Sequence, residues 1–301
     1  MVNSERKAAL ITGAASGMGF ETVKRFSKDP RYNPIYALDL DPSVHTIFEA
    51  AQYPQVVALQ VDIRKGNEIA QVFDKVLKET KNLDVVVNAA GIIIAGDAQG
   101  PEGEKQIANL NDTNFFGQMY VMQRAEIAME SREGGVIINV TSAKDYFPDP
   151  FRFEYMLSKI RFEEMSLYDG ERLREDGVRI VVVKPGNTKT HIDRRDWTQG
   201  YNEGEMKAVQ GFNDWWRRTF GNDPKNVAEV IYKIAEGEID NSVVPVGLDA
   251  KLGYLLVKIP FWRAMFFLGA AGVYAGIIKL QNLRDRLPFK GYNSRDDKNN
   301  F

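Results

Sequence analysis

The sequence predicts an α/β fold, a doubly wound parallel sheet of about seven strands with helices on both faces. Short runs that are apolar throughout alternate along the chain with helical patterns, as expected of strands buried on both faces. Polar residues or glycines directly follow several of these runs. We therefore expect them to meet at the carboxyl edge of the sheet, where folds of this kind bind ligands.

The composition is that of an ordinary globular protein. The chain has 301 residues, of which 44% are hydrophobic and 27% charged, and its formal net charge is -2. This charge gives no support to a nucleic-acid partner. Because there is no Cys and there are only two His, we expect no disulfides and no metal centre. The polar start, residues 1–7, is not a secretory signal, and this favours a cytoplasmic location.

A glycine-rich turn follows the first apolar run, at residues 8–11. The turn occupies residues 12–19, and a helical pattern with Phe20, Val23 and Phe26 on one face comes after it. Strand, turn and helix in this order are typical of a Rossmann-like fold, because the glycines let the backbone approach a dinucleotide pyrophosphate at the helix N-terminus. The candidate cofactor-binding residues in the turn are Gly13, Ser16, Gly17, Met18 and Gly19.

The second apolar run ends in Asp39, twenty residues after Gly19. A carboxylate there can accept hydrogen bonds from ribose hydroxyls and repels a 2′-phosphate. Residues 14–16 and Leu40 supply no cation to offset that repulsion, so the sequence favours NAD over NADP as the cofactor. Asp41 is near enough to share this role, and Asp39 could alternatively be a solvated residue at the end of a strand.

Further strands are predicted at residues 56–61, 83–87, 136–140, 178–183 and 242–246, with helices at 68–78, 111–130, 155–174 and 227–236. Asp62 and Ile63 follow the third strand, where they could meet the adenine. The other candidates after strand ends are Asn88, Gly91, Ser142, Pro185, Gly186, Thr188 and Thr190.

Tyr155 and Lys159 lie four residues apart on a predicted helix and therefore on the same face. A phenol with pKa near 10 is a poor acid or base at neutral pH, but a neighbouring ammonium lowers that pKa. Ser142, thirteen residues before Tyr155, could hold a carbonyl or alcohol oxygen beside the phenol. The three residues would transfer a proton to or from an oxygen whose carbon gains or loses hydride. The alternative is an amphipathic helix with a surface tyrosine and lysine.

Taken together, these residues resemble the short-chain dehydrogenase/reductase superfamily, of the single-domain type. The resemblance covers about residues 7–246. It rests on the TGxxxGxG turn at 12–19, an NNAG-like element at 88–91, a PGxxxT element at 185–190, and the set Asn114, Ser142, Tyr155 and Lys159. Ala89 stands where the family usually has Asn, and Thr188 where it usually has Val or Ile.

The resemblance implies a role for each residue of the catalytic set. Tyr155 would be the general acid/base, and Ser142 would orient the substrate oxygen. Lys159 would lower the pKa of the tyrosine and hold the nicotinamide ribose. Asn114 would hold a water molecule that connects Lys159 to bulk solvent.

The resemblance also implies that Thr190 contacts the nicotinamide carboxamide and that Asn88 braces the sheet near the cofactor. Members of the family are usually dimeric or tetrameric, through the helices that would hold Asn114 and Tyr155. A homodimer or homotetramer is therefore expected here.

Residues 187–224 show little periodicity and contain several aromatic side chains, and a loop this long is usually a functional lid or disordered. The resemblance implies that this region covers the substrate, so we interpret it as a lid. The aromatic residues suggest an apolar or ring-bearing alcohol or ketone, or they could simply pack the lid on the body. The lid would belong to a catalytic domain of residues 1–247, followed by an apolar C-terminal extension and polar tail at 248–301.

The extension contains an uncharged run, residues 264–278, which is shorter than the roughly 20 residues that span a bilayer. Arg263 and Lys279 bracket this run. The extension could contact a membrane surface through residues 252–280, contact another subunit or cover the substrate pocket, and we favour the membrane surface.

The predicted function is NAD-dependent interconversion of a secondary alcohol and a ketone on a lipophilic small molecule such as a steroid or terpenoid, with oxidation favoured. A non-catalytic NAD-binding regulator is one alternative. A lyase or epimerase that uses bound NAD as a transient hydride store is another.

Overall fold

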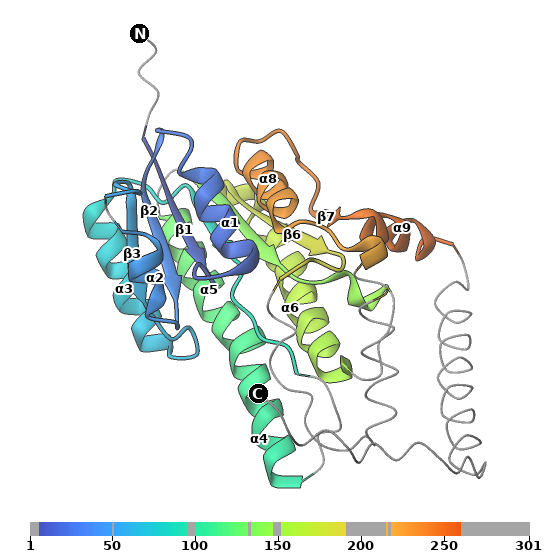
Figure 1. Cartoon of the computed structure of the whole chain (residues 1–301). Coiled ribbons are helices and arrows are strands. Elements are labelled where there is room, and N and C mark those ends of the chain that lie inside the picture. The colour runs from blue at the N-terminus through green and yellow to red at the C-terminus, as the bar shows by residue number, and fades with distance from the viewer. Residues whose placement is uncertain are drawn as a thin grey trace, which may run out of the picture.

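The computed structural model describes residues 6–49, 51–94, 100–131, 134–146, 152–190, 215 and 218–259. In these ranges, parallel strands form a sheet in the order β3-β2-β1-β4-β5-β6-β7 (Figure 1). The strands are β1 (Lys7–Thr12), β2 (Tyr32–Asp39), β3 (Val56–Gln60), β4 (Val85–Asn88), β5 (Gly135–Val140), β6 (Val178–Pro185) and β7 (Val243–Val246). This order confirms the predicted Rossmann-like fold. It also places a crevice where the order reverses, between the carboxyl ends of β1 and β4.

Helices cover both faces of the sheet, so the strands are buried on both sides. Ala9 and Ile11 of β1 face one core, while Ala8 and Leu10 face the other. The first core includes side chains from α1 (Gly17–Phe26), α2 (Ser43–Ile47) and α8 (Pro224–Ala235). The second includes side chains from α3 (Gly66–Glu79), α5 (Gln118–Glu130) and α6 (Phe153–Arg172).

The helix predicted at residues 111–130 begins earlier, as α4 (Gly100–Asn111). Pro101 is well suited to the first turn of a helix, where its missing N–H is not needed. A π-helical segment, η1 (Asp112–Gly117), joins α4 to α5. Such segments are often found at functional sites, and Asn114 lies in this one.

Three short elements complete the description: η2 (Ala143–Asp145), η4 (Arg174–Asp176) and α9 (Leu248–Leu256). Ala250 of α9 packs with Ala143 and Tyr146, so the first residues of the predicted extension contact the segment that follows β5. The domain division after residue 247 stays a prediction.

Most of the predicted lid, residues 191–214 and 216–217, lies outside the described residues, as does the extension from residue 260 onward. In the part of the chain that the structure describes, no helix has the length and apolar character needed to cross a membrane.

Candidate active site

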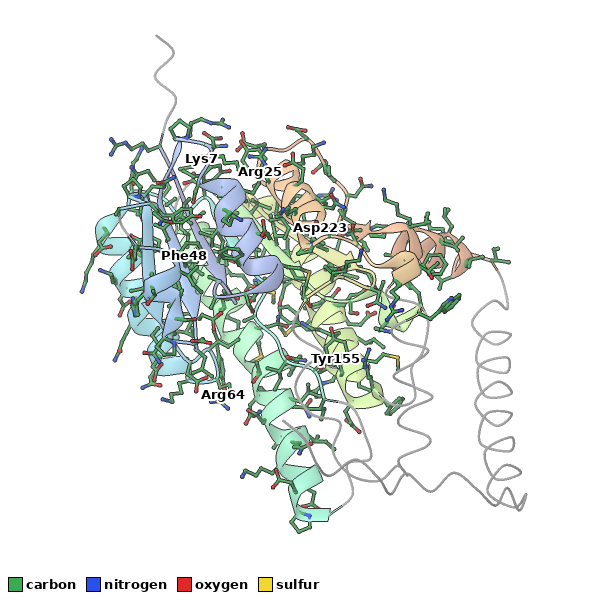
Figure 2. All side chains as sticks on the ribbon, in the orientation of Figure 1. Lys7, Arg25, Phe48, Arg64, Tyr155 and Asp223 are labelled. Carbon is green, nitrogen blue, oxygen red and sulfur yellow. The ribbon has the colours of Figure 1, made fainter. Side chains whose placement is uncertain are left out.

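The carboxyl ends of the strands bring the predicted site residues to one edge of the sheet. Thr12, Asp39, Asn88, Val140 and Pro185 are the last residues of β1, β2, β4, β5 and β6. Figure 2 shows Tyr155 and Arg64 toward this edge and Lys7 and Arg25 toward the opposite one. The candidate site is therefore assembled from segments that are far apart in the sequence.

The turn after β1 requires glycine at three positions. Gly13 and Gly17 have φ of +70° and +58°, which favour glycine. A Cβ on Gly13 would lie 2.8 Å from Ala90 Cα, and one on Gly19 would lie 2.1 Å from the Gly13 carbonyl oxygen. A Cβ on Gly17 would lie 3.2 Å from Thr190 Cγ2. The turn is therefore packed against residue 90, and Thr190 approaches it from the far side of the crevice.

Asn88 and Thr12 hold the back of this crevice. The Thr12 hydroxyl donates to Asn88 Oδ1 at 3.3 Å and accepts from the backbone N–H groups of Ala89 and Ala90, both at 3.1 Å. Asn88 Nδ2 donates to the Gln118 carbonyl at 2.7 Å. Since Asn88 is fully buried, its side chain shapes the crevice from within the protein, and its role near a cofactor stays a prediction.

The N-terminus of α1 suits a cofactor pyrophosphate. Within this described helix no acidic residue lies in the first turn, and the Ser16 side chain makes no capping hydrogen bond. The positive end of the helix is thus not neutralised locally. Asp39 lies nearby, since its Oδ2 accepts from the Ala15 N–H and its Oδ1 from the Asp41 N–H, both at 2.9 Å. Each carboxylate oxygen retains a second lone pair for a ribose hydroxyl, so these residues fit a nicotinamide dinucleotide.

Asp62 is engaged by a cation that sequence reasoning did not consider. The Arg64 guanidinium donates to both Asp62 carboxylate oxygens, at 2.8 and 2.7 Å, and holds the pKa of this carboxyl below its ordinary value. Arg64 also donates to Asn109 Oδ1 of α4 at 2.6 Å. Ile63 packs against Gly117, where a Cβ would lie 2.8 Å from Ile63 Cγ1. Contact of Asp62 and Ile63 with adenine stays a prediction.

Lys159 extends from α6 to the ends of two neighbouring elements. Its Nζ donates to the Val140 carbonyl at 3.1 Å and to Gln118 Oε1 at 3.4 Å. Burial removes water from this ammonium and lowers its pKa to about 7. A Cβ on Gly91 would lie 3.3 Å from both Lys159 Nζ and Asn114 Oδ1, so both polar groups border this glycine.

Asn114 is fully buried and joins three segments. Its amide pairs with the backbone N–H and carbonyl of Ile92, both at 2.8 Å, and donates to Ser158 Oγ at 3.2 Å. Gln118, one turn further along the same helical stretch, holds Lys159 and was missed. The sequence could have indicated Gln118, because it lies four residues after Asn114 and therefore on the same helical face.

Tyr155 lies on α6, one turn before Lys159, and Ser142 follows β5, whose last carbonyl Lys159 contacts. The Tyr155 side chain is 8% exposed and packs with Ile93 and Leu110, beside the segment that follows β4. Ser142 Oγ accepts from the Lys144 N–H at 3.2 Å. The neighbouring Thr141 hydroxyl instead lies 3.4 Å from the Val183 carbonyl of β6. This geometry favours Ser142 over Thr141 as the hydroxyl available to a substrate.

The turn after β6 is held by Asp249, which sequence reasoning also missed. Asp249 Oδ2 accepts from the Asn187 N–H at 2.7 Å. A Cβ on Gly186 would lie 1.8 Å from Asp249 Oδ1, so glycine is needed where this carboxylate docks. The Thr188 hydroxyl donates to the Gly186 carbonyl at 3.1 Å, which satisfies the polar side chain at a position where an apolar one was expected.

A buried charged cluster lies next to this turn. Lys184, 1% exposed, donates to Asp145 Oδ2 at 2.8 Å and to both carboxylate oxygens of Glu163 at 2.6 Å. Burial raises the pKa of Glu163 more than Lys184 lowers it. The cluster ties β6 to η2, which follows Ser142, and to α6, which carries Tyr155. The feature of the sequence that could have indicated this cluster is Lys184, a charged residue directly after the apolar residues 180–183.

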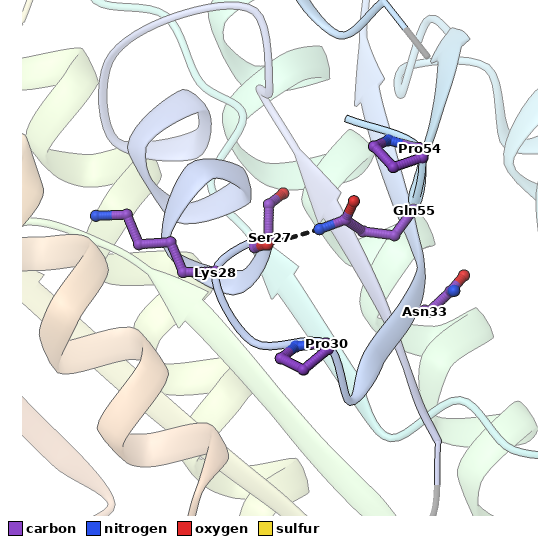
Figure 3. A pocket seen from close by; sticks show the side chains of 6 residues that line it. All are labelled: Ser27, Lys28, Pro30, Asn33, Pro54 and Gln55. Atoms are coloured by element: carbon purple, nitrogen blue, oxygen red, sulfur yellow. Dashed lines mark hydrogen bonds between the residues drawn. The ribbon is translucent and has the colours of Figure 1, made fainter. Parts of the chain in front are cut away.

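A shallow pocket of about 280 Å³ lies elsewhere, lined by Ser27, Lys28, Pro30, Asn33, Pro54 and Gln55 (Figure 3). Ser27, Lys28 and Pro30 precede β2, Asn33 lies at its start, and Pro54 and Gln55 precede β3, so the pocket lies at the amino edge of the sheet. Gln55 Nε2 donates to the Ser27 carbonyl at 2.6 Å, which joins the two segments. Because the candidate site lies at the carboxyl edge, this pocket is not part of it.

Comparison with known proteins gives one consistent family. Residues 7–200 match the family model described as short chain dehydrogenase. A 2,3-dihydro-2,3-dihydroxybenzoate dehydrogenase of Escherichia coli K12 is 29% identical over 213 residues, covering 70% of this chain and 80% of that protein. An uncharacterized oxidoreductase of Schizosaccharomyces pombe is 26% identical over 254 residues, covering 83% and 85%.

A short-chain dehydrogenase from Streptomyces avermitilis has a similar crystal structure. The TM-score is 0.70 at 19% identity, and the match covers 93% of this chain and 98% of that one. At this identity the likeness shows the shared fold.

We expect Lys159 to make stability depend on pH. Because burial lowers its pKa from 10.5 to about 7, the folded chain binds fewer protons than the unfolded chain between these values. The contribution of Lys159 to the free energy of unfolding therefore rises with pH across this window. Urea denaturation from about pH 7 to 10 should show a steeper rise for wild type than for Lys159→Met. Parallel profiles would contradict the lowered pKa, and Lys28→Met, at an exposed position, is the control.

Lys184→Met should destabilise the protein strongly, since it leaves two partly buried carboxylates without their cation. We expect a loss of about 3–5 kcal/mol in the free energy of unfolding, measured by urea denaturation at neutral pH. Adding Glu163→Gln should recover part of this loss. Lys189→Met, at an exposed position, is the matched control. A Lys184→Met loss as small as that of the control would show that the cluster does not stabilise the fold.

Proposed function

The chain belongs to the short-chain dehydrogenase family and is an oxidoreductase, and on that premise we propose that it interconverts a secondary alcohol and a ketone on a lipophilic small molecule, with NAD as cofactor. The observation that carries the proposal is the buried Lys159 Nζ. It lies beside Asn114, one helical turn from Tyr155, at the carboxyl edge of the sheet.

In the proposed reaction Tyr155 exchanges the proton of the substrate oxygen. Ser142 holds that oxygen by a hydrogen bond, and the Lys159 ammonium stabilises the phenolate form of Tyr155. Asn114 supports Lys159 and leads its proton toward solvent through a bound water molecule. When bound, the nicotinamide supplies the acceptor or donor of hydride, and the protein supplies placement and proton transfer.

For the cofactor, Gly13, Ser16, Gly17, Met18 and Gly19 would cradle the pyrophosphate. The nicotinamide half would lie along the segment 185–190, with Thr190 on the carboxamide. The preference for NAD is supported by Asp39, whose carboxylate would oppose a 2′-phosphate. Arg64, the cation after β3, is already paired with Asp62, which is consistent with the same preference.

The substrate class is supported by the side chains around Tyr155. Its ring packs with Ile93 and Leu110, and Ile92 and Ile94 are partly buried against the same cluster. An apolar surface beside a proton-transfer group suits a hydrophobic alcohol or ketone such as a steroid or terpenoid. The Escherichia coli relative is named for a dihydroxylated ring compound, which agrees with a ring-bearing substrate. We propose oxidation as the favoured direction.

We also propose that the chain forms a homodimer or homotetramer through the helices that contain Tyr155 and follow Asn114. In support, Ile127 of α5 and Tyr168 of α6 are 58% and 73% exposed. Large apolar side chains at such positions are suitable for a subunit contact. We propose a cytoplasmic location as well.

Tyr155→Phe should lower kcat by about 10²–10⁴, because the proton carrier is removed. NAD affinity should be unchanged. The test is steady-state oxidation of a panel of steroid, terpenoid and aliphatic alcohols, followed by the absorbance of the reduced cofactor, with NAD binding by calorimetry. Tyr168→Phe, on the exposed side of the same helix, should keep full activity. Retained turnover in Tyr155→Phe would refute the assigned role.

Asp39→Arg should reverse cofactor preference, since the repulsive carboxylate becomes a cation that can pair with a 2′-phosphate. The expected result is a change of at least about tenfold in the ratio of kcat/KM for NADP to that for NAD. Asp41→Arg is the matched control and also tests whether Asp41 shares the role. An unchanged ratio in Asp39→Arg would show that this residue does not select the cofactor.

A further inference from the structure

Helix α9 presents an apolar stripe to solvent. Leu248, Leu252, Leu255 and Ile259 are 69%, 49%, 62% and 53% exposed. The spacing of four and three residues places the three leucines along one side of α9, and Ile259 follows in the turn after the helix. A continuous stripe of this kind is unlike scattered exposed apolar residues and indicates a binding surface.

The opposite side of α9 is fixed to the protein. Asp249 is buried and accepts from the backbone of Asn187, and Ala250 packs with Ala143 and Tyr146. The apolar stripe is therefore held outward by a helix that is anchored beyond β7, at the edge of the sheet (Figure 1). It is not needed for the contacts that attach α9.

Among residues 248–259, which the structure describes, the exposed charges are all positive. Lys251 and Lys258 are exposed, while the acidic residue of α9, Asp249, is buried. In the sequence, no acidic residue occurs between Asp249 and Asp285. The cations in this interval are Lys251, Lys258, Arg263, Lys279 and Arg284. Apolar side chains flanked by lysines are the pattern of a helix that lies in the interface of an anionic bilayer.

We propose that the exposed stripe of α9, with Lys251 and Lys258, docks on the surface of an anionic lipid bilayer. In the sequence, the apolar run 264–278, bracketed by Arg263 and Lys279, likewise combines apolar and basic residues. A second copy of this chain suits the stripe less well, because two identical faces would bring lysines together without a balancing acid.

The docking would also place the active site next to the membrane. Because α9 contacts the segment after Ser142 and the turn that contains Asn187, the substrate end of the crevice would lie near the lipid. This consequence rests on the proposed function and agrees with a lipophilic substrate. The docking itself rests on exposure and charge, and it would hold for an inactive protein as well.

The test uses the full chain in a flotation assay with vesicles of phosphatidylcholine, with and without phosphatidylserine. Wild type should float with the anionic vesicles, and binding should weaken at high salt. Leu252→Asp combined with Leu255→Asp should reduce the partition coefficient by at least about tenfold. Lys251→Glu combined with Lys258→Glu should weaken binding to anionic vesicles by about the same factor.

One matched control should float like wild type: Lys28→Glu combined with Lys105→Glu, at exposed lysines outside α9. Circular dichroism and NAD binding verify that each variant folds. Absent flotation of wild type, or equal flotation of the α9 variants, would overturn the proposal. A third contradicting result combines two measurements: wild type does not bind vesicles, and light scattering shows that the leucine variant is a smaller oligomer than wild type. The stripe would then be a subunit contact.

Discussion

The candidate site depends on the burial of one ammonium group, Nζ of Lys159. Its hydrogen-bond acceptors are the carbonyl of Val140, which ends β5, and the side-chain amide of Gln118, which begins α5. Neither acceptor carries a full charge, so desolvation dominates and the pKa of Lys159 falls to about 7. A phenolate at Tyr155 would supply the missing negative charge. Protonation of Lys159 and ionisation of Tyr155 are then coupled, and their titrations belong to the pair rather than to either residue.

Buried polar groups around this ammonium keep the crevice in shape. Asn88 joins β1, β4 and α5, Asp249 joins α9 to the turn after β6, and Lys184 joins β6 to η2 and α6. If one of these hydrogen-bond partners were lost, a buried polar or charged group would remain unpaired. The free-energy cost of that unpaired group favours one arrangement of the elements. Two glycines allow these segments to approach closely, because Gly186 and Gly13 have no room for a side chain where the segments meet.

The strands and the polar residues at their ends were predictable because each leaves a local pattern. An apolar run predicts a buried strand, and a spacing of four on a helix predicts a shared face, as for Tyr155 and Lys159. Asp249 left no such pattern. It meets Asn187 across a separation of 62 residues, and only the sheet brings them together. Arg64 was missed for a related reason, since a charged residue after a strand is ordinary until its pairing with Asp62 is seen.

The start of α4 was also missed, because Gly100 and Pro101 reduce helix propensity although Pro is well accepted in a first turn. The stripe on α9 was seen as part of an apolar extension. Its attachment through Asp249 and Ala250 depends on tertiary contacts, which periodicity alone does not reveal.

The coupling of Tyr155 to the Lys159 ammonium is tested most directly by titrating tyrosinate absorbance in the NAD-bound enzyme and subtracting the same titration of Tyr155→Phe. We expect one tyrosine with a pKa well below the ordinary value of about 10, present in wild type and absent from the variant. A difference spectrum that shows no tyrosine titrating below that value would contradict it.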